Sequence, residues 1–249
     1  MPRTYATLPR LYVAPDLAPG AAIGLDKGQS NYLINVLRLK KGGQVVVFNG
    51  RDGAWLAAIL TAGRKGAELV PLERIARQSA RSDLWYFFAP VKSARLDYMV
   101  QKATEMGAGH IQPVMTRRTL ASRVNMDRLG ANVIEAAEQC EVLAIPIVQE
   151  PVALGRLIGT WQDHHAGRRL VFADEAATPA SPIERLKTIA GDPLGLIVGP
   201  EGGFAEEERA LLLAQKFVVP VSLGPRVLRA DTAAVAALAV IQAFIGDWR

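Results

Sequence analysis

The chain of 249 residues contains one cysteine, Cys140, and only three histidines. A single cysteine excludes an intrachain disulfide, which is typical of proteins from a reducing compartment. Cys140 falls in a predicted helix, where we expect it to pack rather than to act as a nucleophile. His164 and His165 are adjacent in a polar segment. Because this is not the spacing of metal ligands, we expect no metal site.

The sequence also lacks a long hydrophobic run. The longest uninterrupted apolar stretch, residues 233–241, is rich in alanine and far too short to cross a bilayer. The first residues, MPRTYATLPRLYV, contain no apolar signal-peptide core. The overall composition, half hydrophobic and 21% charged, is that of a globular protein. We therefore expect a cytoplasmic protein that does not contact a membrane.

Acidic residues are scarce in the first third of the chain. Residues 1–78 carry 11 Lys and Arg against 5 Asp and Glu, whereas residues 79–249 carry 18 against 19. A one-sided basic segment is typical of proteins that bind polyanions such as nucleic acid. An ordinary solvated surface has the same composition, so charge leaves both interpretations open.

Residues 10–78 have the pattern of a small β domain. The segments QVVVFNG (44–50) and AWLAAIL (54–60) predict two strands, and the intervening NGRDG predicts a hairpin because Asn and Gly tolerate positive φ. The polar segment LERIARQSARSD (72–83) is interpreted as a linker. We expect one domain over residues 1–78 and a second over residues 79–249.

The second part alternates between strand and helix patterns, which predicts a mostly parallel sheet with helices on both faces. Residues 94–108, for example, have apolar side chains at helical spacing and end near Gly107. The strands are expected at 84–90, 110–116, 168–174, 194–199 and 218–224, and the helices at 94–108, 125–143, 181–190, 205–215 and 231–245.

The segment GLIVGPEGGF (195–204) follows one of these strands. Ligands of open α/β sheets bind beyond the carboxyl ends of the strands, so this loop is placed to hold a cofactor. Its spacing is not G-x-G-x-x-G, and it lacks the lysine of a P-loop. Pro200 removes an amide, and Glu201 with residues 206–208 would repel a polyphosphate. A neutral or cationic ligand and a plain strand-to-helix turn both remain compatible with the loop.

A second loop, LGPRVLRADTA (223–233), also follows a strand and opens a helix. Asp231 or Thr232 is expected to cap that helix. Arg226 and Arg229 fall in the loop, where arginines can clamp a phosphate or pair with carboxylates.

Together these two loops resemble the paired cofactor signatures of SPOUT-class RNA methyltransferases, and most closely those of the RsmE family of bacterial 16S rRNA uridine N3-methyltransferases. VLRLKKGG, FNGRDG, VQKATEMG, TRRT and EAAEQCE resemble further motifs of that family, so the similarity covers nearly the whole chain.

The resemblance implies an α/β fold with an N-terminal PUA-like β-barrel (1–78) and a C-terminal trefoil-knotted SPOUT methyltransferase domain (79–249). It implies a homodimer formed through the knot domain and S-adenosyl-L-methionine as the cofactor. It also implies that the target is N3 of uridine 1498 in 16S rRNA of the small ribosomal subunit. A different rRNA or tRNA target and a non-catalytic RNA-binding protein are the alternatives. The residues expected to bind the cofactor are Phe172, Ala173, Val198, Gly199, Glu201, Gly202, Gly203, Leu223, Gly224, Val227, Leu228, Arg229 and Thr232.

Methyl transfer to uridine N3 requires loss of the N3 proton. A carboxylate can accept that proton, and a cation can favour the anionic base. Glu201 and Arg229 are the candidates for these catalytic roles, although Glu201 is equally suited to fix the turn. The residues expected to bind RNA are Arg10, Arg38, Lys40, Lys41 and Arg226. The family usually has histidines where this chain has Asn31 and Tyr32.

Overall fold

The computed structural model describes residues 5–63, 66–121, 123–177 and 181–248, and its chain divides into two compact units. The first unit consists of the chain up to Ala80 together with residues 137–145, and the second of residues 81–136 and the chain from Pro146 onward. The sequence analysis expected two domains with a boundary between residues 78 and 79. Compact units are not the same as independently folding domains, so this boundary stays a prediction.

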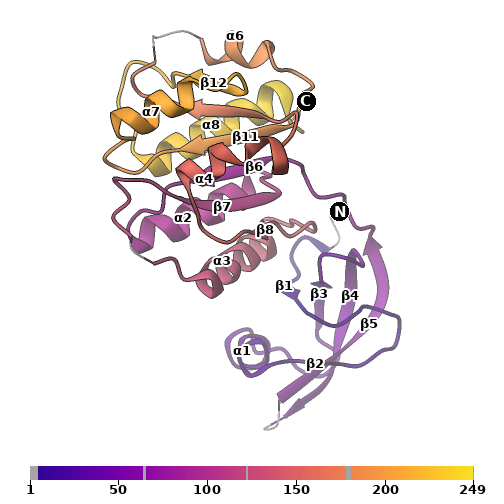
Figure 1. Cartoon of the computed structure of the whole chain (residues 1–249). Coiled ribbons are helices and arrows are strands. Elements are labelled where there is room, and N and C mark those ends of the chain that lie inside the picture. Colours follow the sequence, from indigo (N-terminus) through magenta and orange to yellow (C-terminus); the bar gives the residue numbers. More distant parts are fainter. Residues whose placement is uncertain (1–4, 64–65, 122, 178–180, 249) are drawn as a thin grey trace. The chain divides into compact units, whose positions relative to one another are not determined.

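The first unit is built on a five-stranded mixed sheet with the order β1-β3-β4-β5-β2 (Figure 1). β1 pairs with β3 in parallel, and the other neighbours are antiparallel. The expected hairpin between β3 and β4 is confirmed. In its turn Gly53 has φ +84°, and a Cβ there would lie 2.2 Å from the carbonyl oxygen of Ala76, so only glycine fits. The strands are β1 (Arg10–Tyr12), β2 (Ile23–Gly24), β3 (Gln44–Phe48), β4 (Ala54–Gly63) and β5 (Gly66–Ala76).

The polar segment after residue 71 is not a linker from its start. β5 continues to Ala76, and Arg74 and Ala76 pair with Trp55 and Ala54 of β4. The prediction was wrong for residues 72–76 because backbone pairing with a hydrophobic strand outweighs the polar character of exposed side chains.

Two helical segments of the first unit carry no strong sequence signal. α1 (Lys27–Asn31) is capped at its N-terminus by Asp26, whose carboxylate accepts a hydrogen bond from the Gln29 amide at 2.8 Å. It is followed by a turn of π-helix, Tyr32–Val36, which keeps the label η2. This segment packs Leu33, which is fully buried, against the core of the sheet.

The second unit contains the predicted parallel sheet. Its order is β12-β10-β11-β6-β7-β8, with β9 also pairing with β7, and every pairing is parallel. The strands are β6 (Trp85–Phe88), β7 (His110–Met115), β8 (Ile147–Val148), β9 (Val152–Ala153), β10 (Arg169–Ala173), β11 (Leu194–Val198) and β12 (Val218–Val221).

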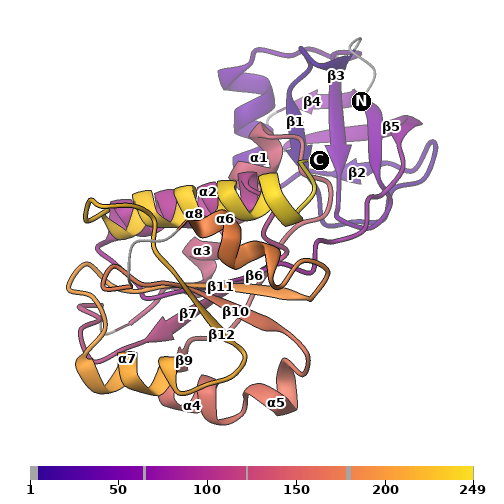
Figure 2. The same cartoon turned by 90° about the horizontal axis from the view of Figure 1, so that it is seen from above.

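Helices cover both faces of this sheet, as expected (Figure 2). One face carries α2 (Ser93–Glu105), α6 (Pro182–Lys187) and α8 (Ala230–Ile245). The other carries α4 (Leu154–Gly159), α5 (Trp161–His164) and α7 (Glu206–Leu213). None of the helices in the described ranges is long and apolar enough to cross a membrane.

Two expectations about single side chains are corrected. α3 (Met126–Gln139) ends before Cys140, and the cysteine is exposed rather than packed inside a helix. His165 is buried, although the sequence analysis placed it in a polar segment. It is only 6% exposed and lies edge-on to Trp85 and Phe87. The sequence analysis did not predict α4, because Gly155 and Gly159 disfavour a helix there. For the same reason it did not predict that the following segment, which contains His165, is buried.

Candidate cofactor site

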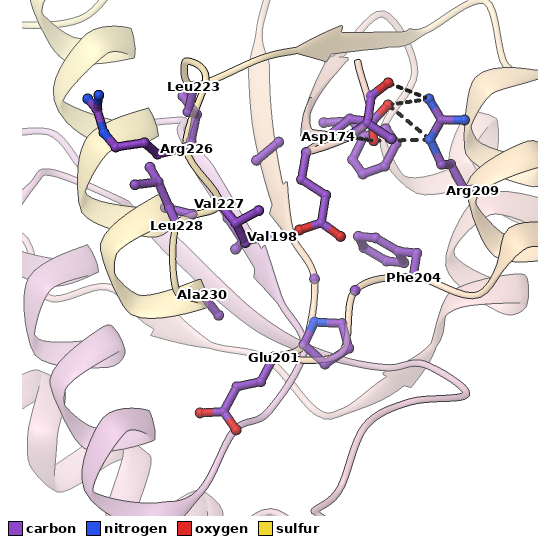
Figure 3. A pocket seen from close by; sticks show the side chains of 18 of the residues that line it. Asp174, Val198, Glu201, Phe204, Arg209, Leu223, Arg226, Val227, Leu228 and Ala230 are labelled. Carbon is purple, nitrogen blue, oxygen red and sulfur yellow. Dashed lines mark hydrogen bonds and ion pairs between the residues drawn. The ribbon is translucent and has the colours of Figure 1, made fainter. Parts of the chain in front are cut away.

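A cavity of about 220 Å³ lies at the carboxyl ends of β10, β11 and β12 in the second unit (Figure 3). The ends of parallel strands meet at one edge of a sheet, so loops far apart in sequence converge there. The lining residues are Phe172, Ala173, Asp174, Glu175, Ala176, Val198, Gly199, Pro200, Glu201, Gly203, Phe204, Arg209, Leu223, Gly224, Arg226, Val227, Leu228, Ala230 and Ala233.

The loop after β11 is a tight turn that needs its glycines. The Gly203 amide donates to the carbonyl oxygen of Pro200 at 2.9 Å, and Gly203 has φ +67°. A Cβ at Gly199 would lie 2.7 Å from the ring of Phe204. The absence of side chains at these two positions therefore leaves the backbone itself as the pocket wall.

The N-terminus of α7, the helix that follows this loop, is capped by a side chain of its own first turn, Glu208. Ala205 has no capping side chain, but its amide donates to Oε2 of Glu208 at 3.0 Å. The other carboxylate oxygen of Glu208 accepts the Arg117 amide at 2.8 Å. Glu208 thus binds two backbone amides at the start of α7, where a negative charge also suits the helix dipole.

The second loop forms the opposite wall. It leads into α8, which begins at Ala230 with Arg229 as the N-terminal flanking residue and without a side-chain cap. The expected capping by Asp231 or Thr232 was wrong, because the helix starts earlier and the Ala233 amide donates to the carbonyl oxygen of Arg229 at 2.8 Å. Val227 lines the cavity although it is 81% exposed.

Asp174 and Arg209 join two walls of the cavity. The guanidinium of Arg209 in α7 donates through Nε and Nη2 to the carboxylate of Asp174, with Nη2 2.8 Å from Oδ2 (Figure 3). The Asp174 side chain is only 3% exposed. Asp174 also accepts the Ala176 amide at 3.1 Å, and its own amide donates to the carbonyl oxygen of Val221 in β12. The hydrogen bond to Asp174 raises the pKa of Arg209.

Glu201 is held at a different end of the cavity. Its carboxylate forms an ion pair with Arg95 in the first turn of α2 and points away from Asp174 and Phe204 (Figure 3). Next to it, the carbonyl oxygen of Gly202 accepts a hydrogen bond from Nη1 of Arg118 at 2.8 Å. Two arginines thus hold the glycine loop from outside.

The structure brings together most of the residues that the sequence analysis assigned to the cofactor. Within the described residues, three of that set do not line the cavity: Gly202 and Arg229, whose neighbours do, and Thr232 in the first turn of α8. The loop around residues 172–174, which the resemblance assigns to the cofactor, includes the lining residue Asp174. The sequence analysis missed several lining residues, among them Glu175, Phe204 and Arg209. Glu175 directly follows the expected strand 168–174 and was predictable from the sequence, whereas nothing local marks Arg209.

The residues expected to bind RNA differ in exposure. Arg38, Lys40 and Lys41 are exposed in the first unit, and Arg38 has φ +56°. Arg10 is half-buried with its guanidinium 5.3 Å from the ring centre of Phe48, and burial lowers its pKa. Arg226 lines the cavity, but its guanidinium points away from Val198 (Figure 3).

No cluster of three or more potential metal ligands occurs among the side chains that the structure describes.

Two family models match the chain. A model described as "RNA methyltransferase domain" matches residues 78–242, and one described as "RNA methyltransferase PUA domain" matches residues 25–72. The first spans more than half of the chain and contains every residue that lines the cavity.

Similar proteins cover nearly the whole length. Ribosomal RNA small subunit methyltransferase E of Rickettsia conorii is 32% identical over 94% of each chain. A protein from Legionella pneumophila, solved in complex with the cofactor SAM, is 30% identical over 95% of this chain and 97% of that one, with a TM-score of 0.81. A ribosomal RNA small subunit methyltransferase E from Neisseria gonorrhoeae bound to S-adenosyl methionine is 25% identical over 97% of this chain and all of that one, with a TM-score of 0.82.

Proposed function

This chain belongs to the ribosomal RNA small subunit methyltransferase E family, and we propose that it transfers a methyl group from S-adenosylmethionine to N3 of a uridine in 16S rRNA. The observation that carries the proposal is the cavity at the ends of β10, β11 and β12, formed by the two glycine-containing loops. Full-length structural neighbours were solved with S-adenosylmethionine bound. Uridine 1498 is the proposed target on the family resemblance.

The residues of the cavity fit this cofactor chemically. Phe172, Leu223, Val227 and Leu228 offer apolar surface to the adenine, and the bare backbone at Gly199 and Gly203 offers close contact. One lining carboxylate, Glu175, is exposed in the cavity, which suits a ligand with a positive sulfonium. The other residues proposed to contact it are Ala173, Val198, Glu201, Gly202, Gly224, Arg229 and Thr232.

When bound, S-adenosylmethionine supplies an electrophilic methyl group, and the chain has to position the uracil and remove its N3 proton. We assign proton removal to Glu201 and stabilisation of the anionic uracil to Arg229, which is exposed beside the lining residues Leu228 and Ala230. To accept the proton, the Glu201 carboxylate must turn away from Arg95. The ion pair equally supports a purely positioning role for Glu201, and the kinetics of variants at Glu201 and Arg95 separate the two roles.

The RNA contacts are proposed for Arg38, Lys40 and Lys41 in the first unit and for Arg226 beside the cavity. Arg10 belongs to the same proposal, although its guanidinium must leave Phe48 to reach a phosphate. The PUA-like barrel, the trefoil knot and the cytoplasmic location are further parts of the proposal, supported by the family resemblance and, for the first unit, by the PUA family model.

A homodimer through the second unit is also part of the proposal. Aromatic side chains lie exposed on α2 and near the end of α8, with Tyr98 42%, Phe244 38% and Trp248 55% exposed. Such a surface suits a protein partner. Light scattering of the purified chain is expected to give twice the monomer mass of 26.8 kDa.

Two measurements test the function. Calorimetry is expected to detect S-adenosylmethionine binding, and no binding at millimolar cofactor would exclude an enzyme of this kind. Mapping of modified uridines in a strain lacking the protein is expected to show loss of N3-methyluridine from 16S rRNA. Persistence of that modification would redirect the assignment to another rRNA or to tRNA.

A further inference from the structure

Three acidic side chains from different loops line the cavity: Asp174, Glu175 and Glu201. Two of them already have cationic partners. Asp174 accepts hydrogen bonds from Arg209, and Glu201 pairs with Arg95. Their charges are therefore compensated by the protein before any ligand arrives, and they serve to hold the walls of the cavity.

Glu175 differs from these two. Among the side-chain interactions of the described residues, none engages its carboxylate, and the side chain is exposed to the solvent of the cavity. It also reaches across to the glycine loop. Its Oε1 lies 2.9 Å from the position that a Cβ of Gly203 would occupy. A carboxylate from the end of β10 thus lies against the loop after β11.

We propose that the Glu175 carboxylate binds hydrogen-bond donors of the cofactor, either the ribose hydroxyls or the ammonium group of the methionyl end. This inference rests on the proposed function. An ionised carboxylate only accepts hydrogen bonds, and S-adenosylmethionine carries donors at both ends. Charge-assisted hydrogen bonds are about twice as strong as neutral ones, so a carboxylate without a protein partner inside a ligand cavity is a strong recognition element.

The same geometry bears on Gly203. A Cβ there would contact the carboxylate of Glu175, but this is the far end of an exposed side chain and can move aside, so the positive φ is what requires glycine at this position. Gly203→Ala is therefore expected to weaken cofactor binding mainly by straining the turn.

Calorimetry on the full-length protein tests the proposal with two probes, S-adenosylmethionine and 5′-methylthioadenosine. The latter keeps the ribose but lacks the amino-acid end. Glu175→Gln is expected to weaken S-adenosylmethionine binding by about tenfold or more. The matched control is Glu150→Gln, an exposed carboxylate of the same unit that does not line the cavity, and it is expected to leave binding unchanged.

The second probe identifies the donor. If Glu175→Gln weakens both ligands equally, the carboxylate binds the ribose hydroxyls; if it weakens only S-adenosylmethionine, the carboxylate acts on the cationic methionyl end, whose ammonium and sulfonium are both absent from 5′-methylthioadenosine. Unchanged affinity for both ligands, with an unchanged melting temperature, overturns the inference while leaving the proposed function intact. Absence of binding by the unsubstituted protein would instead overturn the proposed function.

Discussion

The guanidinium of Arg209 binds both carboxylate oxygens of Asp174. The pair connects α7, which follows the glycine loop after β11, with the end of β10. Because the aspartate side chain is almost fully buried, it depends on this partner. Removing one member of a buried ion pair leaves an uncompensated charge, which costs far more than an exposed pair contributes.

We expect Arg209→Met, which keeps the length of the side chain, to lower the free energy of unfolding by about 2–4 kcal/mol. We also expect it to weaken S-adenosylmethionine binding at least tenfold, since both attached loops line the cavity. Arg117→Met is the control, because the ion pair of Arg117 with Glu207 is exposed on both sides and contributes little. Chemical denaturation and calorimetry measure the two effects. Equal stabilities of the two variants would contradict the role of the buried pair.

The pair of Arg95 and Glu201 allows the two roles of Glu201 to be separated. If Glu201 removes the N3 proton, Glu201→Gln is expected to lower kcat by 10²-fold or more, the usual contribution of a general base, with little change in KM for the cofactor. Arg95→Met would then leave kcat largely intact. If Glu201 only positions the loop, both variants should raise KM for S-adenosylmethionine to a similar degree. Steady-state kinetics with 30S subunits distinguishes the two patterns.

The exposed cations of the first unit have a measurable electrostatic signature. Each phosphate contact steepens the decrease of binding with salt by roughly 0.7–0.9 in the log–log slope. Replacing Arg38, Lys40 and Lys41 by Gln is therefore expected to reduce the slope by about 2–3. Cofactor affinity should stay the same. An unchanged salt slope in RNA-binding titrations would remove these three residues from the RNA contact.

The buried His165 predicts a pH dependence of stability. Burial lowers its pKa to about 4, and the positive charge of Arg168 acts in the same direction, whereas Asp83 opposes it. In the unfolded chain the histidine titrates near 6.5. Its neutral form is thus favoured by folding. The contribution to stability is complete above pH 6.5 and is lost progressively as the pH falls towards 4.

His165→Leu is expected to remove this component. Between pH 7 and 4 the unfolding free energy of the wild-type protein should fall by roughly 1–3 kcal/mol more than that of the variant. The carboxylate of Asp97, whose pKa is lowered by Arg128, also loses its contribution to stability as the pH falls towards 4, but it does so equally in both proteins, so the difference between them isolates His165. Urea denaturation at several pH values measures the difference, and parallel curves for the two proteins would contradict it.

The second unit was the more predictable part of the chain. Its strands and long helices have strong periodicity, and the loops at 199–203 and 223–228 were recognisable because Gly and Pro stand at the ends of hydrophobic strands. The partners of Asp174 and Glu201 were not predictable, since Arg209 and Arg95 are distant in sequence and meet them only through the tertiary fold. Residues 72–76 were predicted wrongly for a different reason: their polar sequence indicates a linker, but their backbone pairs with β4 and extends β5.

The acidic first turn of α7 makes the two walls of the cavity differ in charge. Glu206 and Glu207 are exposed beside the glycine loop, whereas Arg226 and Arg229 are exposed at the opposite wall. Arg117 compensates Glu207, whereas the cations of the loop before α8 are exposed, so a polynucleotide that approaches over that loop meets the more positive wall. The two walls therefore favour one side of the cavity for the approach of RNA.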